Sequence, residues 1–133
     1  MGSELLDAAN LLLPIFGFID ANDPRMCSTI EAVVRTLLKD GLVYRYRGAD
    51  DGLPGGEAAF AVCTFRLVEN LVALGRIDEA TRVFEGMLAR ATPLGLYAEE
   101  IEPGSGAQRG NFPQALTHIG LLNAAAALAD ASP

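Results

Sequence analysis

The sequence predicts an all-α fold in which helices pack in two layers. Half of the 133 residues are apolar and only 7% are aromatic, a composition that favours helices over strands. Helical segments that are apolar over most of their circumference alternate with segments that carry a single apolar stripe. A layered helical toroid requires this alternation, because its inner helices line the core and its outer helices cover them.

Two helices open the chain. An inner helix is expected over residues 3–18, with Ser3 as its N-cap. An outer helix is expected over residues 24–39, with Asp23 as its N-cap and Pro24 at the first helical position, where a missing N–H breaks no helical bond.

Three further helices follow a long connection. Residues 57–74 form the most apolar segment, so this helix should lie innermost. Asp78 should cap an outer helix with one apolar stripe, and residues 111–129 should form a last, very apolar helix.

Two long loops each follow an outer helix and precede an inner one. The first begins at residue 42 with alternating apolar, aromatic and basic residues, which predicts a short extended segment before a structured loop. Loops of this length in a compact domain often carry function. Both loops should emerge at the same end of the fold, which places Arg45, Tyr46 and Glu57 on one rim with Glu99 and Glu100.

Charge and cysteine content exclude several classes of function. A net charge of −7 argues against nucleic-acid and anionic-membrane partners, which attract clustered Lys and Arg. Cys27 and Cys63 are expected to be small buried apolar residues rather than a disulfide, and one histidine provides no familiar zinc spacing. No metal or cofactor is expected. The apolar run at residues 11–19 is too short to span a bilayer, so we expect a cytoplasmic protein.

The second loop carries three carboxylates in four positions: Glu99, Glu100 and Glu102. Its Pro and Gly content forbids a continuous helix. Spacing alone is compatible with solvated loop charges, and that remains the interpretation for Glu102.

Five segments resemble the catalytic domain of glycoside hydrolase family 15, the bacterial glucoamylase and trehalase group. They are DGLVYRY at 40–46, GLPGGEAAF at 52–60, GRIDEA at 75–80, GLYAEEI at 95–101 and GNFPQALTH at 110–118. The resemblance covers nearly all of residues 1–133 and implies one segment from the C-terminal part of an (α/α)₆ toroid, with about five of its helices. The substrate that it implies is an α-glucoside or glucan.

The resemblance also implies site residues. The family hydrolyses with inversion and needs two carboxylic acids, one of which activates water while the other protonates the leaving oxygen. Glu99 matches the general base, and Glu100 would orient the loop or contact a sugar hydroxyl. Arg45 and Tyr46 match a rim segment that contacts sugar, and Glu57 matches an acidic residue at the start of an inner helix.

Structural roles are the alternative for several of these residues. Arg45 could pair with Asp50 or Asp51 instead of sugar, and Tyr46 could pack under its loop.

Residues of the last segment are expected to be structural rather than catalytic. Asn111 and Gln114 should cap and brace the last helix, and His118 should be a buried, hydrogen-bonded histidine. Arg66 departs from the family pattern, and on an inner helix it needs a partner or a solvent-facing position.

The family's general acid lies upstream, and nothing in residues 1–22 resembles it. The chain alone should therefore be inactive or nearly so, because a missing proton donor lowers rates by about 10²–10⁴-fold. Its expected partners are a second copy of itself or the N-terminal half of the same enzyme. The alternative function is a non-catalytic helical module that binds carbohydrate or a partner protein. Trehalose, maltose and other α-glucosides stay open as parent substrates.

Overall fold

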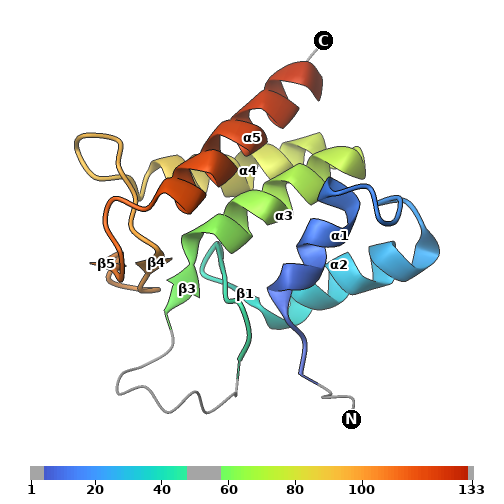
Figure 1. Ribbon diagram of the computed structural model, residues 1–133, viewed down its shortest axis with the longest axis horizontal. Coiled ribbons are helices and arrows are strands. Elements are labelled where there is room, and N and C mark those ends of the chain that lie inside the picture. The colour runs from blue at the N-terminus through green and yellow to red at the C-terminus, as the bar shows by residue number, and fades with distance from the viewer. Residues whose placement is uncertain (1–4, 48–57, 132–133) are drawn as a thin grey trace.

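The computed structural model describes residues 5–47 and 58–131. Over those ranges the helices are η1 (Ala8–Leu11), α1 (Leu12–Ile15), α2 (Pro24–Thr36), α3 (Ala61–Ala73), α4 (Ile77–Leu88) and α5 (Ala115–Ala131). The strands have two residues each: β1 (Leu38–Lys39), β2 (Leu42–Val43), β3 (Ala59–Phe60), β4 (Glu100–Ile101) and β5 (Gln108–Arg109). Helices carry the fold, which confirms the all-α class (Figure 1).

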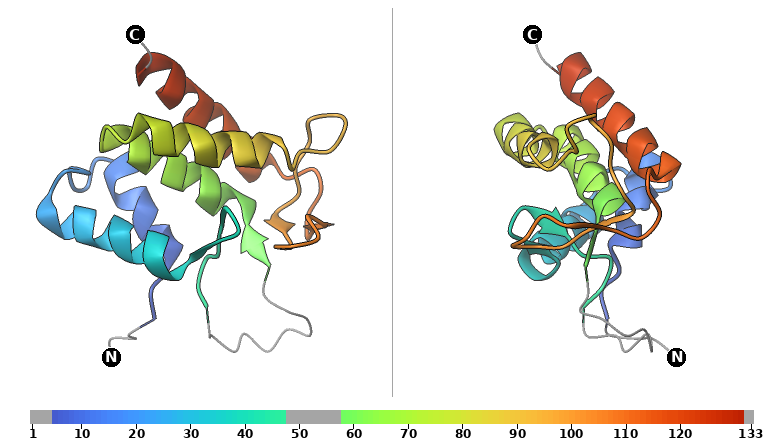
Figure 2. Two further views of the ribbon diagram at one scale, coloured as in Figure 1. Left: turned by 180° about the vertical axis from the view of Figure 1, so that it is seen from behind. Right: turned by 90° about the vertical axis from the view of Figure 1, so that its left-hand side faces the viewer.

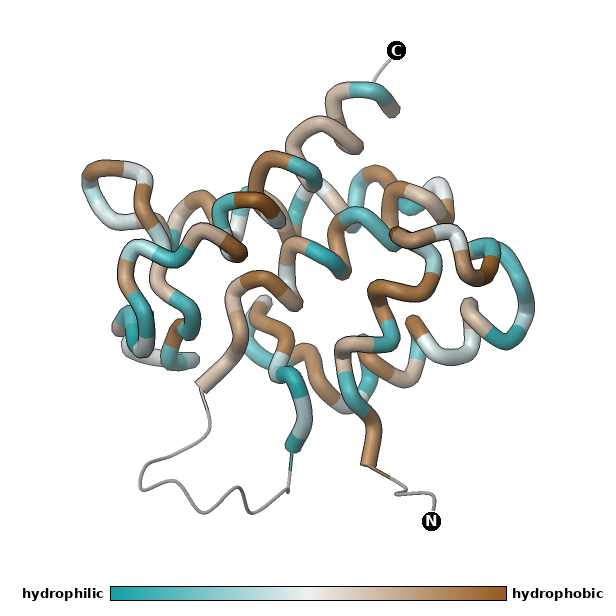
Figure 3. The backbone as a smooth tube through the Cα atoms, viewed as in Figure 1, coloured by the Kyte–Doolittle hydropathy of each residue, from teal (hydrophilic) through white to brown (hydrophobic). Residues whose placement is uncertain are grey.

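Helix α3 is the centre of the molecule. It packs against α1, α4 and α5, as the views from behind and from the side show (Figure 2). Its buried residues are Ala61, Val62, Cys63, Thr64, Phe65, Leu67, Val68, Asn70 and Leu71. Apolar residues recur along α1, α3 and α5, while the connections are more polar (Figure 3). Helix α3 is thus the innermost helix, as the sequence predicts.

Short antiparallel strands replace the expected ends of two helices. Helix α2 stops at Thr36 rather than Lys39, because Leu38 and Lys39 pair with β2 across a turn at Asp40, whose φ is +52°, and Gly41. Helix α3 begins at Ala61 rather than residue 57, since β3 precedes it and pairs with β4, which in turn pairs with β5. The extended segment expected from residue 42 is β2.

Two expected caps are wrong. Ser3 lies outside the described residues, and the helix assigned to it starts later, where Asp7 Oδ1 accepts the Ala9 N–H at 2.8 Å. This first helix opens as a 3₁₀ turn and ends before Phe16. Asp78 lies inside the first turn of α4, and Arg76 occupies the N-cap position without a side-chain cap bond.

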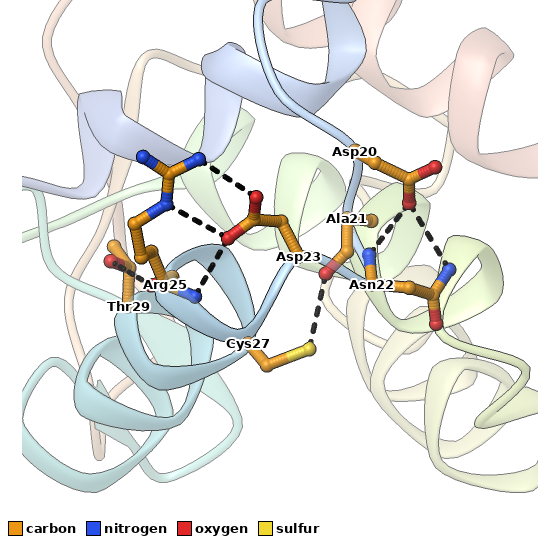
Figure 4. Close-up of polar contacts among 7 residues, drawn as sticks. All are labelled: Asp20, Ala21, Asn22, Asp23, Arg25, Cys27 and Thr29. Atoms are coloured by element: carbon orange, nitrogen blue, oxygen red, sulfur yellow. Dashed lines mark hydrogen bonds and ion pairs between the residues drawn. The ribbon is translucent and has the colours of Figure 1, made fainter.

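The expected cap of α2 is confirmed (Figure 4). Asp23 Oδ1 accepts the backbone N–H of Arg25 at 2.9 Å and its Nε–H at 3.0 Å, and Asp23 Oδ2 accepts from Nη2 at 2.8 Å. Asp20 Oδ1 accepts the Asn22 N–H at 2.8 Å and shapes the turn before the helix. Hydrogen bonds from the Arg25 side chain and then its backbone lower the pKa of Asp23 from 3.8 to about 2.

Acidification should weaken this cap. The folded state favours the ionised carboxylate, so the contribution of Asp23 is complete above pH 3.8 and is lost as the pH falls towards about 2. In this window, thermal unfolding followed by circular dichroism should show a steeper fall in Tm for the parent chain than for Asp23→Asn, since Asn caps without titrating. Asp130→Asn, an exposed carboxylate on α5, is the control. Equal slopes for the parent and Asp23→Asn would contradict the assignment.

The two cysteines are both free. Cys63 is buried in α3 as expected, and burial raises the pKa of its thiol to about 11. Cys27 is only half-buried and donates from Sγ to the Ala21 carbonyl at 3.3 Å. Over residues 5–47 and 58–131, no helix is both long and apolar enough to cross a membrane.

Candidate functional site

The backbone of the acidic loop is fastened to the start of α3. The Glu99 carbonyl accepts the N–H of Ala61, the first residue of α3, at 3.0 Å. The Glu99 N–H donates to the Asn111 carbonyl at 2.9 Å. The main chain of Glu99 is therefore held from both sides, between the central helix and the segment that leads into α5.

One oxygen of the Glu99 carboxylate is also held. Oε2 accepts the Asn111 backbone N–H at 3.2 Å and the Asn111 Nδ2–H at 3.1 Å. Oε1 has no hydrogen bond to any described residue. The residue is half-buried, and its carboxylate is oriented through Oε2.

Gly110 makes this close approach possible. Its φ is +74°, a left-handed conformation that glycine adopts without strain. A Cβ at this position would lie 2.9 Å from Glu99 Oε2 and 3.1 Å from Glu99 Cβ. A side chain at position 110 would thus displace the carboxylate.

A buried aromatic pair, Tyr97 and Phe65, anchors the acidic loop to the core. Tyr97 is fully buried, and its ring meets the edge of Phe65 of α3 with 5.6 Å between centroids. Its hydroxyl donates to the Met87 carbonyl of α4 at 2.9 Å. Desolvation raises the pKa of Tyr97 above its ordinary value. The loop is therefore anchored to both α3 and α4 just before Glu99.

The start of α5 braces the same loop. His118 Nε2 lies 3.3 Å from the Tyr97 N–H, and Nδ1 lies 2.7 Å from the Gln114 carbonyl. Both ring nitrogens of His118 therefore contact the backbone, one on the acidic loop and one at the start of α5. Thr117 Oγ1 donates to the Ala98 carbonyl at 3.1 Å. Gln114 braces the start of α5 as expected, and His118 is hydrogen-bonded as expected but only half-buried.

The other two acids of the loop have different surroundings. Glu100 is half-buried in the middle strand β4, in register with Phe60 and Arg109. Glu102 Oε1 lies 2.5 Å from Arg109 Nη2, and its Oε2 accepts the Ser105 hydroxyl at 2.6 Å. Glu102 is therefore a loop charge that is still partly exposed to solvent, as expected, and it forms an ion pair with Arg109.

Arg45 contacts the start of the first helix rather than Glu99. Its Nε lies 3.7 Å from Asp7 Oδ1, and its guanidinium lies 5.8 Å from the ring centroid of half-buried Tyr46. Its carbonyl accepts the Ala8 N–H at 2.7 Å. Asp50, Asp51 and Glu57, which the sequence analysis also named, lie outside the described residues.

The strands place these residues at one end of the molecule. Arg45 and Tyr46 follow β2, which contacts β3, and β3 pairs with β4 beside Glu99 (Figure 1). No hydrogen bond or ion pair within the described ranges joins Arg45 or Tyr46 to Glu99. The same ranges contain no group of three acidic, Cys or His residues able to hold a metal.

Comparison with known proteins agrees with this arrangement. The family model described as glycosyl hydrolases family 15 matches residues 1–126. The chain belongs to this family. It is 50% identical over 125 residues to a trehalase of Mycobacterium tuberculosis and, over the same length, to one of Mycolicibacterium smegmatis. A trehalase of Thermoplasma volcanium is 44% identical over 130 residues.

The chain matches only part of the length of these relatives. The match covers 92% of this chain but 18% of the Mycobacterium tuberculosis trehalase, and 98% of this chain but 21% of the Thermoplasma volcanium trehalase. The chain thus spans about a fifth of the length of these relatives.

Solved structures confirm the fold. A wild-type glycosidase superposes with a TM-score of 0.80 at 24% identity, over 100% of this chain and 38% of that one. A glycosidase variant in complex with glucose superposes with a TM-score of 0.81 at 23% identity and the same coverage. The helices therefore have the arrangement expected for part of an (α/α)₆ toroid.

The contacts that Asn111 and Gly110 make with Glu99 are not predicted from the sequence. Asn111 is expected to support the last helix, whereas its amide and backbone N–H both hold Glu99. Gly110 carries one usable signal, since a glycine before a polar residue in a loop often marks a positive φ.

Proposed function

We propose that this chain supplies the water-activating half of an inverting α-glucosidase site, with Glu99 as the general base. The observation that carries the proposal is the Glu99 carboxylate, whose Oε2 is held by Asn111 while Oε1 has no hydrogen bond to a described residue. A general base needs a fixed orientation and one oxygen within hydrogen-bond reach of the water it deprotonates. Family membership supplies the reaction class, and the names of the relatives favour trehalose as the parent substrate.

The proposed step needs two carboxyl groups. Glu99 Oε1 takes a proton from water as the water oxygen bonds to the anomeric carbon, and the glycosidic bond breaks on the opposite side of the ring. The leaving oxygen takes its proton from an acid about 6.5–9.5 Å from the base. We place that acid outside this chain. Arg45, Tyr46, Glu57 and Glu100 are the proposed sugar contacts of the rim.

The isolated chain should therefore show no turnover. Purified chain incubated with trehalose, maltose or a short α-glucan should release no glucose above the buffer blank, since base catalysis without acid loses about 10²–10⁴-fold. Turnover that Glu99→Gln abolishes would overturn the proposed absence of the acid, and Glu57 would then be the first candidate for it.

A chimera tests the role of Glu99 directly. In it, this chain replaces the 125-residue matching segment of the Mycolicibacterium smegmatis trehalase. Trehalose hydrolysis by the chimera supports the proposal if it depends on Glu99. A folded chimera without activity contradicts it.

We also propose that the protein is cytoplasmic. Both cysteines are free thiols, the state that a reducing compartment maintains.

A further inference from the structure

Both backbone groups of Ala98, the residue before Glu99, bond to side chains. The Ala98 N–H donates to Gln108 Oε1 at 2.6 Å, and the Ala98 carbonyl accepts from Thr117 Oγ1 at 3.1 Å. By contrast, both backbone groups of Glu99 bond to other backbone atoms. Ala98 is fully buried, so water does not replace a partner that is lost. The path of the chain into Glu99 therefore depends on side chains that single substitutions can remove.

Gln108 bridges the acidic loop and the end of α4. It lies in β5 and is half-buried. While its Oε1 accepts from Ala98, its Nε2 donates to the carbonyl of Arg90, just after α4, at 2.9 Å. A side-chain amide is suited to this position because it accepts and donates at the same time. The two bonds fix the orientation of the amide and hold the Ala98 peptide beside the end of α4.

Arg90 extends this connection to the other loop of the rim. Its Nη2 donates to the Asp40 carbonyl at 2.7 Å, and its Nη1 donates to the Gly86 carbonyl at 2.6 Å. Asp40 belongs to the turn between β1 and β2, and β2 leads to the proposed sugar contact Arg45. Hydrogen bonds therefore run from this turn through Arg90 and Gln108 to the acidic loop.

We propose that Gln108 is a positioning residue for Glu99. By holding the Ala98 peptide, it sets where the Glu99 carboxylate lies relative to Asn111 and to the reacting water. Gln108 acts through the backbone and is not itself a catalytic residue. A shift of about 1 Å in a catalytic group costs up to about 10²-fold in rate, so a bond next to the base has a large effect.

The first test uses this chain alone and needs no turnover. Nuclear magnetic resonance of the Asn111 side-chain amide reports the position of the carboxylate, because Nδ2–H donates to Glu99 Oε2. Gln108→Met keeps the length of the side chain but removes the amide. It should move this resonance towards its position in Glu99→Gln, with unchanged helix content by circular dichroism. Gln108→Asn, whose amide is one methylene too short to reach both partners, should do the same and serves if Gln108→Met does not fold. An unmoved resonance would overturn the proposal.

Two matched variants separate positioning from a general loss of stability. Arg109→Met introduces the same side chain at the next residue of β5, where the guanidinium pairs with Glu102, and it should leave the Asn111 resonance in place. Gln108→Glu keeps an acceptor for the Ala98 N–H but, when ionised, donates no hydrogen bond. It should therefore restore the parent resonance even with a lower Tm. Equal movement in the two methionine variants, or no restoration by Gln108→Glu, would contradict the assignment.

The chimera provides the kinetic test, with each protein assayed at its own pH optimum. Gln108→Met should lower kcat about tenfold and change KM less than about twofold, because a displaced base slows the chemical step without weakening sugar binding. Arg109→Met should change neither constant, and Gln108→Glu should restore most of kcat. A rise in KM with unchanged kcat would overturn the proposal, since it would assign Gln108 to substrate binding.

The outcome for positioning is separable from the outcome for catalysis. This proposal rests on the proposed function for the role of Glu99 as the base. A folded chimera that hydrolyses no trehalose contradicts that role, whereas the Asn111 resonance in the isolated chain still decides whether Gln108 sets the position of the carboxylate. A resonance that moves as expected in an active chimera whose kcat does not change would overturn the positioning role alone.

Discussion

Glu99→Gln should reduce trehalose turnover by the chimera by roughly 10²–10⁴-fold, the usual contribution of a general base. The change keeps the size of the side chain and a carbonyl oxygen able to accept from Asn111, so the loop geometry should survive. The amide cannot take a proton from water, so kcat should fall while KM changes little. Initial rates of glucose release over a range of trehalose concentrations measure both constants.

Glu102→Gln is the matched control, because it removes a carboxylate three residues further along the same loop. Glu102 pairs with Arg109, away from Asn111, and its loss should change kcat less than about twofold, as expected of an exposed ion pair. Equal losses in both variants would mean that loop stability, rather than proton transfer, limits turnover. A chimera that stays fully active with the Glu99→Gln change would remove Glu99 from the mechanism.

The sequence predicts the helical layers well because their signal is local. Helix α3 is apolar on nearly every face, and a helix of this kind is buried at the centre of the fold because each exposed face would place apolar side chains in water. Asp23 and Pro24 define the start of α2 for the same reason, since a cap and a fixed φ act within one turn.

The sequence fails where distant segments decide the structure. Strand β3 exists because Ala59 and Phe60 pair with β4 about 40 residues away, which no periodicity in two residues reveals. Arg45 has acidic neighbours in sequence, yet its described partner is Asp7, brought close by the fold. The family motif points to Glu99 as the proposed base. The contact with Asn111 that orients its carboxylate depends instead on the three-dimensional path of the loop.

Gly110→Ala should be among the most destabilising single changes in the loop. Alanine at a φ of +74° is strained by about 1–2 kcal/mol. Its Cβ would also lie 2.9 Å from Glu99 Oε2, a clash that adds about 1–3 kcal/mol if the loop shifts to relieve it. Together these terms should lower Tm by roughly 10 °C. Thermal unfolding of the isolated chain followed by circular dichroism measures the change.

Gly104→Ala separates the two causes, because Gly104 also has a positive φ, +88°, but nothing lies within 4 Å of its added Cβ. It should show the backbone strain alone, a fall of about 4 °C. The additional fall in Tm of Gly110→Ala over Gly104→Ala then measures the displacement of Glu99. That displacement should also lower kcat in the chimera, whereas Gly104→Ala should leave kcat unchanged. Equal shifts at the two positions would mean that the loop absorbs the clash without moving the carboxylate, and the close approach of Gly110 would then have no part in orienting Glu99.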